Sequence, residues 1–411
     1  MPKLRRKSKA SSDTHILEKF LQTYEKHCTG TQSCISTTIK QGLKKCIANE
    51  MLITKFVLAN VETSLRNLKP VSLTPLLKTI RDERYQLGKE LCLWGIQLLP
   101  QDIANLAILL ELDGRTIYPF SKLEIIHTEL DLWSMERLGM ALPYSNLNSL
   151  VLDYSRCGDN GVKKLISGLE GNTKLLTLSL CYCDLGPESG STLGTIVAQT
   201  AICNLYINGN NLQCVGATKL LKPITDYAES LGQKRRENAL VYSNDTTHQI
   251  AAVANKDAGI HSKVGSLNVT SKADMFTTLE NTKKKKRKGF KKKSKQPDPG
   301  PWLAKLHLAD NAIDKRLNQI EKSIMECIQL LSCLIKNSEH LVEIDINGNA
   351  IGEQCAVKIL EALRDRKKEE MPGLKIKVTP QITSETFREI FRSCSKLSPT
   401  KKRKKKKTKR L

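Results

Sequence analysis

Apolar residues recur along the chain with one spacing that appears in six places. In each copy an apolar residue is followed by apolar residues three and five positions later, a small or polar residue at eight and an apolar residue at ten. The clearest copy is Ile202, Leu205, Ile207, Asn210 and Leu212. Because the residues at three and five alternate with period two, each copy predicts one very short strand with a single buried face.

The other copies follow this spacing with small departures. Two precede the clearest copy and two follow a long interruption: Leu147, Leu150, Leu152, Ser155 and Cys157; Leu175, Leu178, Leu180, Cys183 and Leu185; Leu303, Leu306, Leu308, Asn311 and Ile313; Leu341, Ile344, Ile346, Asn349 and Ile351. A weaker copy starts at Leu123, with Ile126, Thr128, Asp131 and Trp133. The pattern predicts strands at residues 149–153, 177–181, 204–208, 305–309 and 343–347.

The repeat length and the polar position predict how the copies assemble. Starts at 147, 175 and 202 give periods of 28 and 27 residues, which leave room for a helix behind each strand. The Asn at position eight can satisfy backbone groups of the turn with its side-chain amide. One unit cannot bury its own apolar edge, so the units must stack. We therefore expect an α/β solenoid with a curved parallel sheet and outer helices, in which strand 305–309 lies beside strand 204–208.

This pattern resembles the ribonuclease-inhibitor type of leucine-rich repeat. The resemblance covers the motifs from Leu123 to about Leu221 and from Leu303 to about Leu363. Cys stands in place of Asn at 183 and Ser at 155. Cysteine acts as a small hydrophobic residue in such a coil, so we expect Cys157, Cys181 and Cys183 to pack within it. The resemblance implies partner binding without naming the partner.

The rest of the pattern divides the chain into six parts. We expect a disordered basic arm at 1–12, an N-terminal cap with degenerate repeats at 13–122 and leucine-rich repeats at 123–238. A disordered Lys-rich insert follows at 239–301, then C-terminal repeats and a cap at 302–395 and a basic tail at 396–411. Within the cap, Asp13 is expected to begin a helix, and residues 53–58 and 91–96 to form degenerate coils.

The net charge of +24 belongs to three segments and not to the repeats. Five basic residues lie in 3–9, ten in 283–295 and nine in 401–410, and none of these segments contains an acid. Subtracting these 24 from the 66 basic residues leaves 42, which equals the 42 acids of the chain. Such runs repel themselves and usually act as interaction tails. They are candidate contacts for a polyanion: Lys283, Lys284, Lys285, Lys286, Arg287, Lys288, Lys401, Lys402, Arg403 and Lys404.

Three readings of these basic runs stay open: nuclear import, contact with nucleic-acid phosphates, and contact with an acidic protein surface. Only Phe290 interrupts the middle run, which disfavours base stacking on aromatic side chains. The thirteen cysteines show no framework or zinc spacing, and no phosphate loop or catalytic motif is present. We therefore expect no enzyme activity and no cofactor. The chain starts on a polar stretch and holds no long apolar run, so we expect no membrane insertion and reduced thiols.

The positions between and just after the paired apolar residues predict a binding surface. They should project from the concave face of the sheet, where aromatic side chains are favoured anchors. The alternative is that Tyr occurs at these positions only because it has a high strand propensity. The candidate protein-binding residues are Trp94, His127, Asp153, Tyr154, Tyr182, Tyr206, Asn208, His307 and Asp345.

The order of repeats, Lys-rich insert and final repeats resembles some ciliary and axoneme-associated leucine-rich-repeat proteins. Residues 90–98 are similar to an early coil of that group, and residues 20–28 to the start of a centrosomal relative. This implies a scaffold of the cytoplasm, cytoskeleton or cilium. The alternative is a nuclear or nucleolar protein whose basic segments bind RNA.

Overall fold

A computed structural model describes residues 2–60, 70–111, 118–254, 300, 302–314, 321–379 and 381–394. The side chains of residues 2–13, 239–254 and 321–322 are outside this description. The predictions of a disordered insert and basic tail fall mostly on residues 255–299 and 395–411, which lie outside the described residues. One unit comprises residues 1–232 and 297–411, and a second comprises residues 233–296.

Within the described residues, nine strands form one parallel sheet in the order in which they occur along the chain. They are β1 (Lys55–Ala59), β2 (Glu90–Trp94), β3 (Lys122–Ile126), β4 (Ser149–Val151), β5 (Thr177–Ser179), β6 (Asn204–Tyr206), β7 (Lys305–His307), β8 (Glu343–Asp345) and β9 (Lys375–Lys377). All five strands expected from the template are confirmed, each shortened to three residues. The degenerate coils near 53–58 and 91–96 are β1 and β2.

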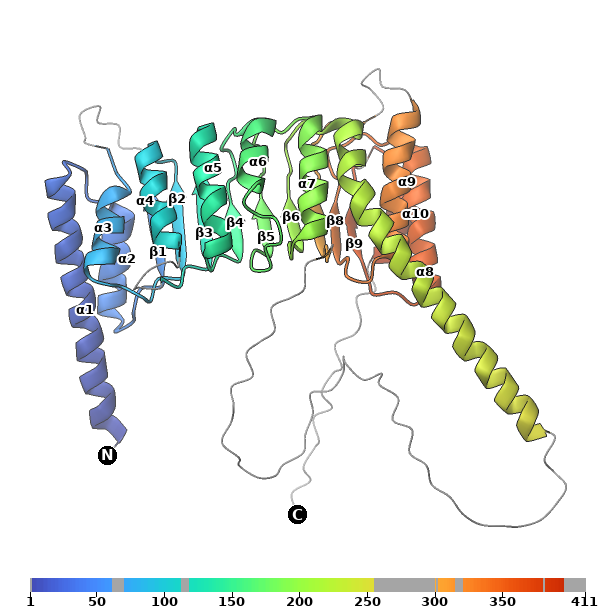
Figure 1. Cartoon of the computed structure of the whole chain (residues 1–411), viewed down its shortest axis with the longest axis horizontal. Helices are drawn as coiled ribbons and strands as arrows, with labels where there is room; N and C mark the ends of the chain where they lie inside the picture. Colours follow the sequence, from blue (N-terminus) through green and yellow to red (C-terminus); the bar gives the residue numbers. More distant parts are fainter. Residues whose placement is uncertain are drawn as a thin grey trace, which may run out of the picture. The chain divides into compact units, whose positions relative to one another are not determined.

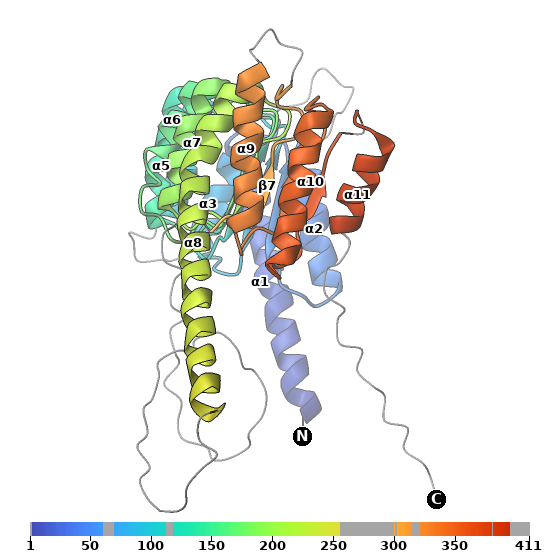
Figure 2. The same cartoon turned by 90° about the vertical axis from the view of Figure 1, so that its right-hand side faces the viewer.

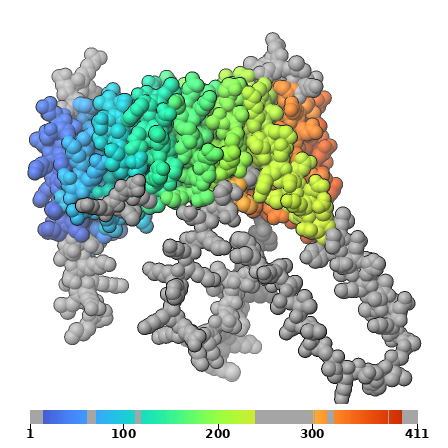
Figure 3. Space-filling model, in the orientation of Figure 1, coloured from blue at the N-terminus to red at the C-terminus, as the bar shows by residue number. Residues whose placement is uncertain are grey.

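Helices cover one face of this sheet, and the other face is open (Figures 1 and 2). The helices between strands are α3 (Thr74–Asp82), α4 (Pro100–Leu110), α5 (Leu132–Ala141), α6 (Gly158–Ile166), α7 (Pro187–Gln199), α8 (Gln213–Ala254), α9 (Glu321–Asn337) and α10 (Glu353–Lys368). A short 3₁₀ turn, η1 (Leu142–Tyr144), follows α5. At the ends lie α1 (Pro2–Gly30), α2 (Thr37–Ala48) and α11 (Ser384–Cys394). Figure 3 shows the coils following one another in chain order across the helical face. The protein is thus a leucine-rich-repeat-like α/β solenoid.

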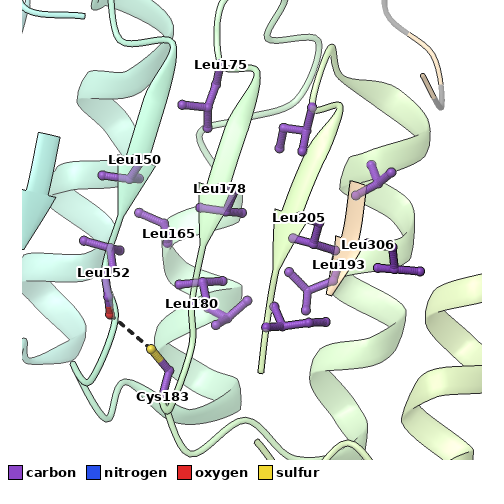
Figure 4. Close-up of a cluster of buried hydrophobic side chains, with 14 of the residues drawn as sticks. Leu150, Leu152, Leu165, Leu175, Leu178, Leu180, Cys183, Leu193, Leu205 and Leu306 are labelled. Carbon is purple, nitrogen blue, oxygen red and sulfur yellow. Dashed lines mark hydrogen bonds between the residues drawn. The ribbon is translucent and has the colours of Figure 1, made fainter. Parts of the chain in front are cut away.

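The core is a continuous stack of the template leucines between the sheet and the helices. Leu150, Leu178, Leu205 and Leu306 occupy the same register position on four neighbouring strands and are fully buried (Figure 4). Leu165 of α6 and Leu193 of α7 face them from the helix layer. Each side chain of this size contributes about 1.5–3 kcal/mol when buried, and neighbouring coils share that gain.

Strand β7 pairs with β6 although about a hundred residues separate them in sequence, which confirms the expected neighbour. Asn204 lies opposite Lys305, Leu205 opposite Leu306 and Tyr206 opposite His307. The chain therefore leaves the solenoid after β6 through α8 and returns directly to the next coil. The insert interrupts the sequence of repeats and leaves the sheet continuous.

The sheet register corrects the copy that the sequence placed at Leu123. Leu123 pairs with Leu150, so it holds the first strand position and not the start of the copy. The true copy is Phe120, Leu123, Ile125, Thr128 and Leu130, all of them buried. The sequence allowed the error because Ile125 and Ile126 are both apolar and because an aromatic residue, not Leu or Ile, opens the coil.

Two helices extend beyond the ends expected from sequence. Helix α1 starts at Pro2, so residues 2–12 are helical and the prediction of a disordered arm with a helix beginning at Asp13 is wrong. Residues 3–29 contain neither Gly nor Pro, so nothing in them ends a helix. Helix α8 continues to Ala254, past the expected end at Asn238 and into the predicted insert.

Candidate functional site

The open face of the sheet carries one central row of side chains. They are the residues between the two buried apolar positions of each strand, and their register fixes them as neighbours: Val57, Cys92, Glu124, Val151, Ser179, Tyr206, His307, Asp345 and Lys377. We call this set the central row. Alternation along a strand sends these residues away from the leucine core, to the face that the helices do not cover. Cys92, Glu124, Ser179 and Asp345 are nevertheless buried on this face.

A second set of predicted residues forms a stack just beyond the strands. The rings of His127 and Tyr154 lie 4.3 Å apart, centroid to centroid, with their planes 9° from parallel. The rings of Tyr154 and Tyr182 lie 4.7 Å apart and 4° from parallel. Tyr154 is 40% exposed and Tyr182 43% exposed, and His127 is exposed as well. We call these three residues the aromatic ladder. The structure thus brings three of the predicted site residues into one row.

The backbone explains why the rings stack. His127, Tyr154 and Tyr182 all have positive φ, of 55°, 60° and 55°, and occupy the same place in successive coils. Three other coils have Gly at this place, Gly95, Gly209 and Gly348, also with positive φ. Non-glycine residues pay roughly 1–2 kcal/mol for this conformation. The repeating turn therefore aims each side chain in the same direction, one coil spacing apart.

Hydrogen bonds between coils hold this left-handed position in place. The backbone N–H groups of His127, Tyr154 and Tyr182 donate to the carbonyls of Asp153, Cys181 and Asn208 in the next coil, at 3.1, 2.8 and 2.8 Å. At the C-terminal end of the ladder, the Tyr182 ring packs on Gly209, where an added Cβ would lie only 2.1 Å from the ring. The ladder is therefore a fixed surface whose rings keep their orientation without a ligand.

Two predicted binding residues hold the coils together. The Asp153 Oδ1 atom accepts from the Ser179 hydroxyl at 2.7 Å and from the Cys181 N–H at 2.9 Å. The Asn208 Oδ1 atom accepts from the Ala309 N–H at 2.8 Å. Both side chains are half-buried. Each of them bonds the coil that follows its own, so their first role is to fix the turns that carry the ladder.

The C-terminal part of the central row is a polar cluster. The Tyr206 and His307 rings meet edge to face at 4.6 Å. The Nε2 atom of His307 lies 3.8 Å from a Glu343 oxygen, too far for a hydrogen bond. Burial lowers the pKa of His307, against the opposing effect of Asp345 and Glu343. Asp345 is 6% exposed and its carboxylate accepts from Lys377 at 2.7 Å, which raises the pKa of that lysine.

Trp94 lies at the end of β2 on the N-terminal part of the open face, opposite Ile126 of β3. Its indole N–H donates to Glu124 at 3.0 Å, and the Lys55 ammonium lies 5.9 Å from its ring centre. Burial raises the pKa of Glu124, but hydrogen bonds from Lys122, Cys92 and Trp94 outweigh it and leave the pKa lowered. Trp94 is 37% exposed, so its ring is still accessible from solvent.

Two charged members of the central row, Glu124 and Lys377, were not among the binding residues predicted from the repeat pattern. Glu124 was missed because the copy at Leu123 was placed in the wrong register. The signal was present, since Leu123 and Ile125 flank Glu124 as Leu150 and Leu152 flank Val151. Lys377 becomes a neighbour of Asp345 only through the pairing of β8 with β9.

The predicted polyanion contacts, residues 283–288 and 401–404, lie outside the described residues. Within the described part of the chain, no group of three or more His, Cys, Asp or Glu side chains is placed to hold a metal ion. No helix among those described is long and apolar enough to span a bilayer.

Comparison with the sequence models of known protein families and with curated proteins finds no match to this chain.

Proposed function

We propose that the chain is a non-catalytic interaction scaffold that binds a protein partner through the open face of its sheet. The aromatic ladder of His127, Tyr154 and Tyr182 is the observation that carries this proposal. Its rings are exposed, parallel and fixed by the backbone, so a partner that contacts them loses little side-chain entropy. Tyrosine in such a setting offers apolar area and a hydroxyl at once, which is why it is enriched at interfaces.

The central row supplies polar recognition beside the ladder. Tyr206 and His307 present an aromatic edge. Asp345 and Lys377 form an ion pair whose charges cancel. Such a surface favours a specific protein over a generic polyanion, because its charges are already balanced. We place this scaffold in the cytoplasm, with the cytoskeleton or the cilium as its setting. That placement rests on the sequence resemblance to ciliary and axoneme-associated repeat proteins.

Paired substitutions in the ladder test the proposal. When the protein is used to purify partners from an extract of ciliated cells, the double variant Tyr154→Ser with Tyr182→Ser should fail to recover one set of proteins. The free energy of binding to the purified partner should become weaker by about 2 kcal/mol or more. Tyr144→Ser is the matched control, because Tyr144 is 58% exposed and lies in η1, outside the ladder. Equal recovery of every protein by the ladder variant and the control would refute the proposal. A tagged copy located away from cilia and cytoskeleton would refute the placement.

A second candidate function rests on the acid-free basic runs. A nuclear protein that binds RNA through residues 283–295 and 401–410 would show affinity that falls steeply with salt. Neutralising Lys401 to Lys407 should then weaken RNA binding and flatten the salt slope by roughly 0.7–0.9 per lost phosphate contact. If this variant abolishes all binding and the ladder variant has no effect, the solenoid serves only to carry its basic segments.

A further inference from the structure

The aromatic ladder ends on its C-terminal side at the Tyr182 ring. One face of this ring stacks on Tyr154, 4.7 Å away, and the ring packs on Gly209 in the next coil. Because Gly209 has no side chain, the stack stops there. Tyr182 is 43% exposed, so a large part of the ring that Tyr154 does not cover is in contact with solvent. The ladder thus presents an aromatic surface at this end to an incoming group.

A carboxylate follows this ring in the same row of turns. Asp310 holds the ladder place two coils beyond Tyr182: its φ is 51°, and its N–H donates to the Asn347 carbonyl of the next coil at 2.9 Å. The Asp310 carboxylate leans over Gly348, just as the Tyr182 ring leans over the glycine of its next coil. The two glycines therefore let both side chains point in the same direction along the solenoid.

The Tyr182 ring and the Asp310 carboxylate bound a space that suits one planar group. They lie over turns that are two coils apart, which is roughly 9–10 Å at the usual spacing of parallel strands. A group placed halfway would keep the spacing that the ladder rings already have, 4.3 and 4.7 Å. The side chain that would otherwise enter this space is missing, because its position is Gly209. Partial burial raises the pKa of Tyr182, and Tyr154 and the nearby charge of Asp310 raise it further.

The charge around this space is negative. Asp184 lies two residues after the outer ring, and both Asp184 and Asp310 are exposed. Among the described side chains neither of these two carboxylates forms an ion pair. Glu129 and Arg156 lie two residues after the other two rings, and their charged groups are 4.0 Å apart, so their charges largely cancel. The half-buried carboxylate of Asp153 adds to the negative field.

These features favour a cation over other groups. An acidic peptide or a nucleic acid would bring negative charge against Asp184 and Asp310, and like charges repel. A proline or an aromatic side chain would stack on the ring but leave both carboxylates without a partner. The one lysine of the central row, Lys377, is already paired with Asp345 at 2.7 Å and does not supply that partner. The space and its charges are therefore free for a cation from outside.

Among cations, the guanidinium of arginine matches this geometry best. It is planar, it stacks on aromatic faces, and it donates to carboxylates through several N–H groups at once. The ammonium of lysine is compact and strongly hydrated, and it does not stack. A flat cation between a tyrosine ring and a carboxylate uses both of its faces and its edge.

We propose that the ladder binds an arginine-bearing segment of the protein partner, with the guanidinium stacked on Tyr182 and paired with Asp310 and Asp184. This inference rests on the proposed function, because it names the chemistry of the partner that the ladder receives. The stacking contact and the charge-assisted hydrogen bonds reinforce each other, since one group makes both.

Peptide selection on the intact chain tests this proposal. Random peptides displayed on phage are selected against the full-length protein and counter-selected against Tyr182→Ser. Peptides that bind the basic runs are discarded, because both proteins carry the same runs. The remaining peptides should contain arginine and carry a net positive charge. In anisotropy titrations they should bind Tyr182→Ser at least about 30-fold more weakly than the wild type.

Neutralising Asp310 shows whether the guanidinium is paired with it. Asn tolerates a left-handed backbone, so Asp310→Asn should keep its fold, which circular dichroism and urea unfolding check. Replacing the critical arginine of a selected peptide by citrulline, its neutral planar analogue, should weaken binding to the wild type about tenfold or more. In Asp310→Asn this loss should be smaller by at least about threefold, because the two groups are coupled. Asp226→Asn is the matched control and should behave as the wild type, since Asp226 lies on α8 and pairs there with Lys222 at 2.6 Å.

A second control separates recognition of arginine from attraction by charge. A peptide of residues 283–295, with ten basic residues of which one is arginine, should bind at least about tenfold more weakly than the selected peptides. Equal binding would mean charge alone and would overturn the proposal, as would equal citrulline losses in the wild type and in Asp310→Asn. Peptides that depend on Tyr182 but lack arginine would overturn it too, while leaving the ladder as a protein-binding site. Selection of no peptide that depends on Tyr182 would contradict it as well, and the purification from cell extract would then test the proposed function by itself.

Discussion

At the residue scale, the polar position of each repeat decides how the turns are satisfied. The Asn210 amide donates to the carbonyls of Leu180 and Ile207 at 2.9 and 2.8 Å, and its oxygen accepts from the N–H groups of Cys183 and Leu185 at 2.9 and 3.1 Å. Asn349 repeats this arrangement two coils later. A buried amide that joins two coils in this way does for a solenoid what a cap does for a helix.

In other coils a thiol or a hydroxyl stands in place of this amide and makes only some of its hydrogen bonds. The Cys183 thiol donates to the Leu152 carbonyl at 3.1 Å, the bond drawn in Figure 4. The Thr128 hydroxyl donates to the Ile96 carbonyl at 3.0 Å. Each provides one donor where Asn provides two, and neither provides the accepting oxygen in the same position. The sequence departures from Asn therefore weaken individual turns without ending the repeat.

We expect Asn210→Ala to lower the free energy of unfolding by about 3 kcal/mol, because four buried backbone groups lose their partner. Urea unfolding followed by circular dichroism measures the change. Asn204→Ala is the control, because the half-buried Asn204 amide donates to the Thr177 hydroxyl at 3.1 Å on the open face of the sheet. This variant should lose less than about 1 kcal/mol of unfolding free energy. Similar losses for both variants would show that the buried amide has no special role.

At the element scale, each coil is a strand, a turn and a helix whose boundaries are set by local chemistry. Pro lies in the first turn of α3, α4 and α7, where its missing N–H costs nothing. Asp131 is the N-cap of α5, and its carboxylate accepts from the Ser134 N–H at 2.7 Å. The sequence had placed Asp131 at the buried turn position of the repeat. The register of β3 moves that position to Thr128 and leaves Asp131 as a cap.

Asp131→Ala should cost about 1 kcal/mol of unfolding free energy, which is typical of a lost N-cap, and Asp131→Asn should cost much less because the amide oxygen can accept the same bond. Thermal and urea unfolding of both variants provide the measurement. A loss as large as that expected for Asn210→Ala would instead place Asp131 among the buried turn residues and would contradict the register.

At the scale of the whole molecule, the solenoid tolerates a long interruption because its coils touch only their neighbours. Strand β7 packs beside β6 through the same layer of buried apolar side chains that joins the other neighbouring strands. The entropy lost on closing a loop rises only slowly with loop length. An insert between two coils therefore lowers the stability of the solenoid only slightly. The large gain from stacking the next coil exceeds it.

Removing the insert should therefore leave the solenoid intact. We expect deletion of residues 240–299, closed by a flexible Gly/Ser linker of about 15 residues, to change the unfolding free energy by less than about 1 kcal/mol. Urea unfolding of the deleted and full-length chains gives the comparison. The same deletion combined with Leu306→Ala serves as a positive control and should lose about 2–5 kcal/mol. A loss of several kcal/mol from the deletion alone would indicate that the insert packs on the solenoid.

The spacing of apolar residues along the chain was enough to predict the repeat, the parallel strands, the resumption of the sheet after the insert and all three ladder residues, because a fixed spacing of buried leucines has only one way to stack. Three features became visible only in the folded chain: the register of β3, the stacking of Tyr154 between His127 and Tyr182, and the open apolar groove between β9 and α11. Each depends on which residues of different coils become neighbours. Two adjacent isoleucines satisfy the same local pattern, and no spacing along one chain records how completely an end helix covers the last strand.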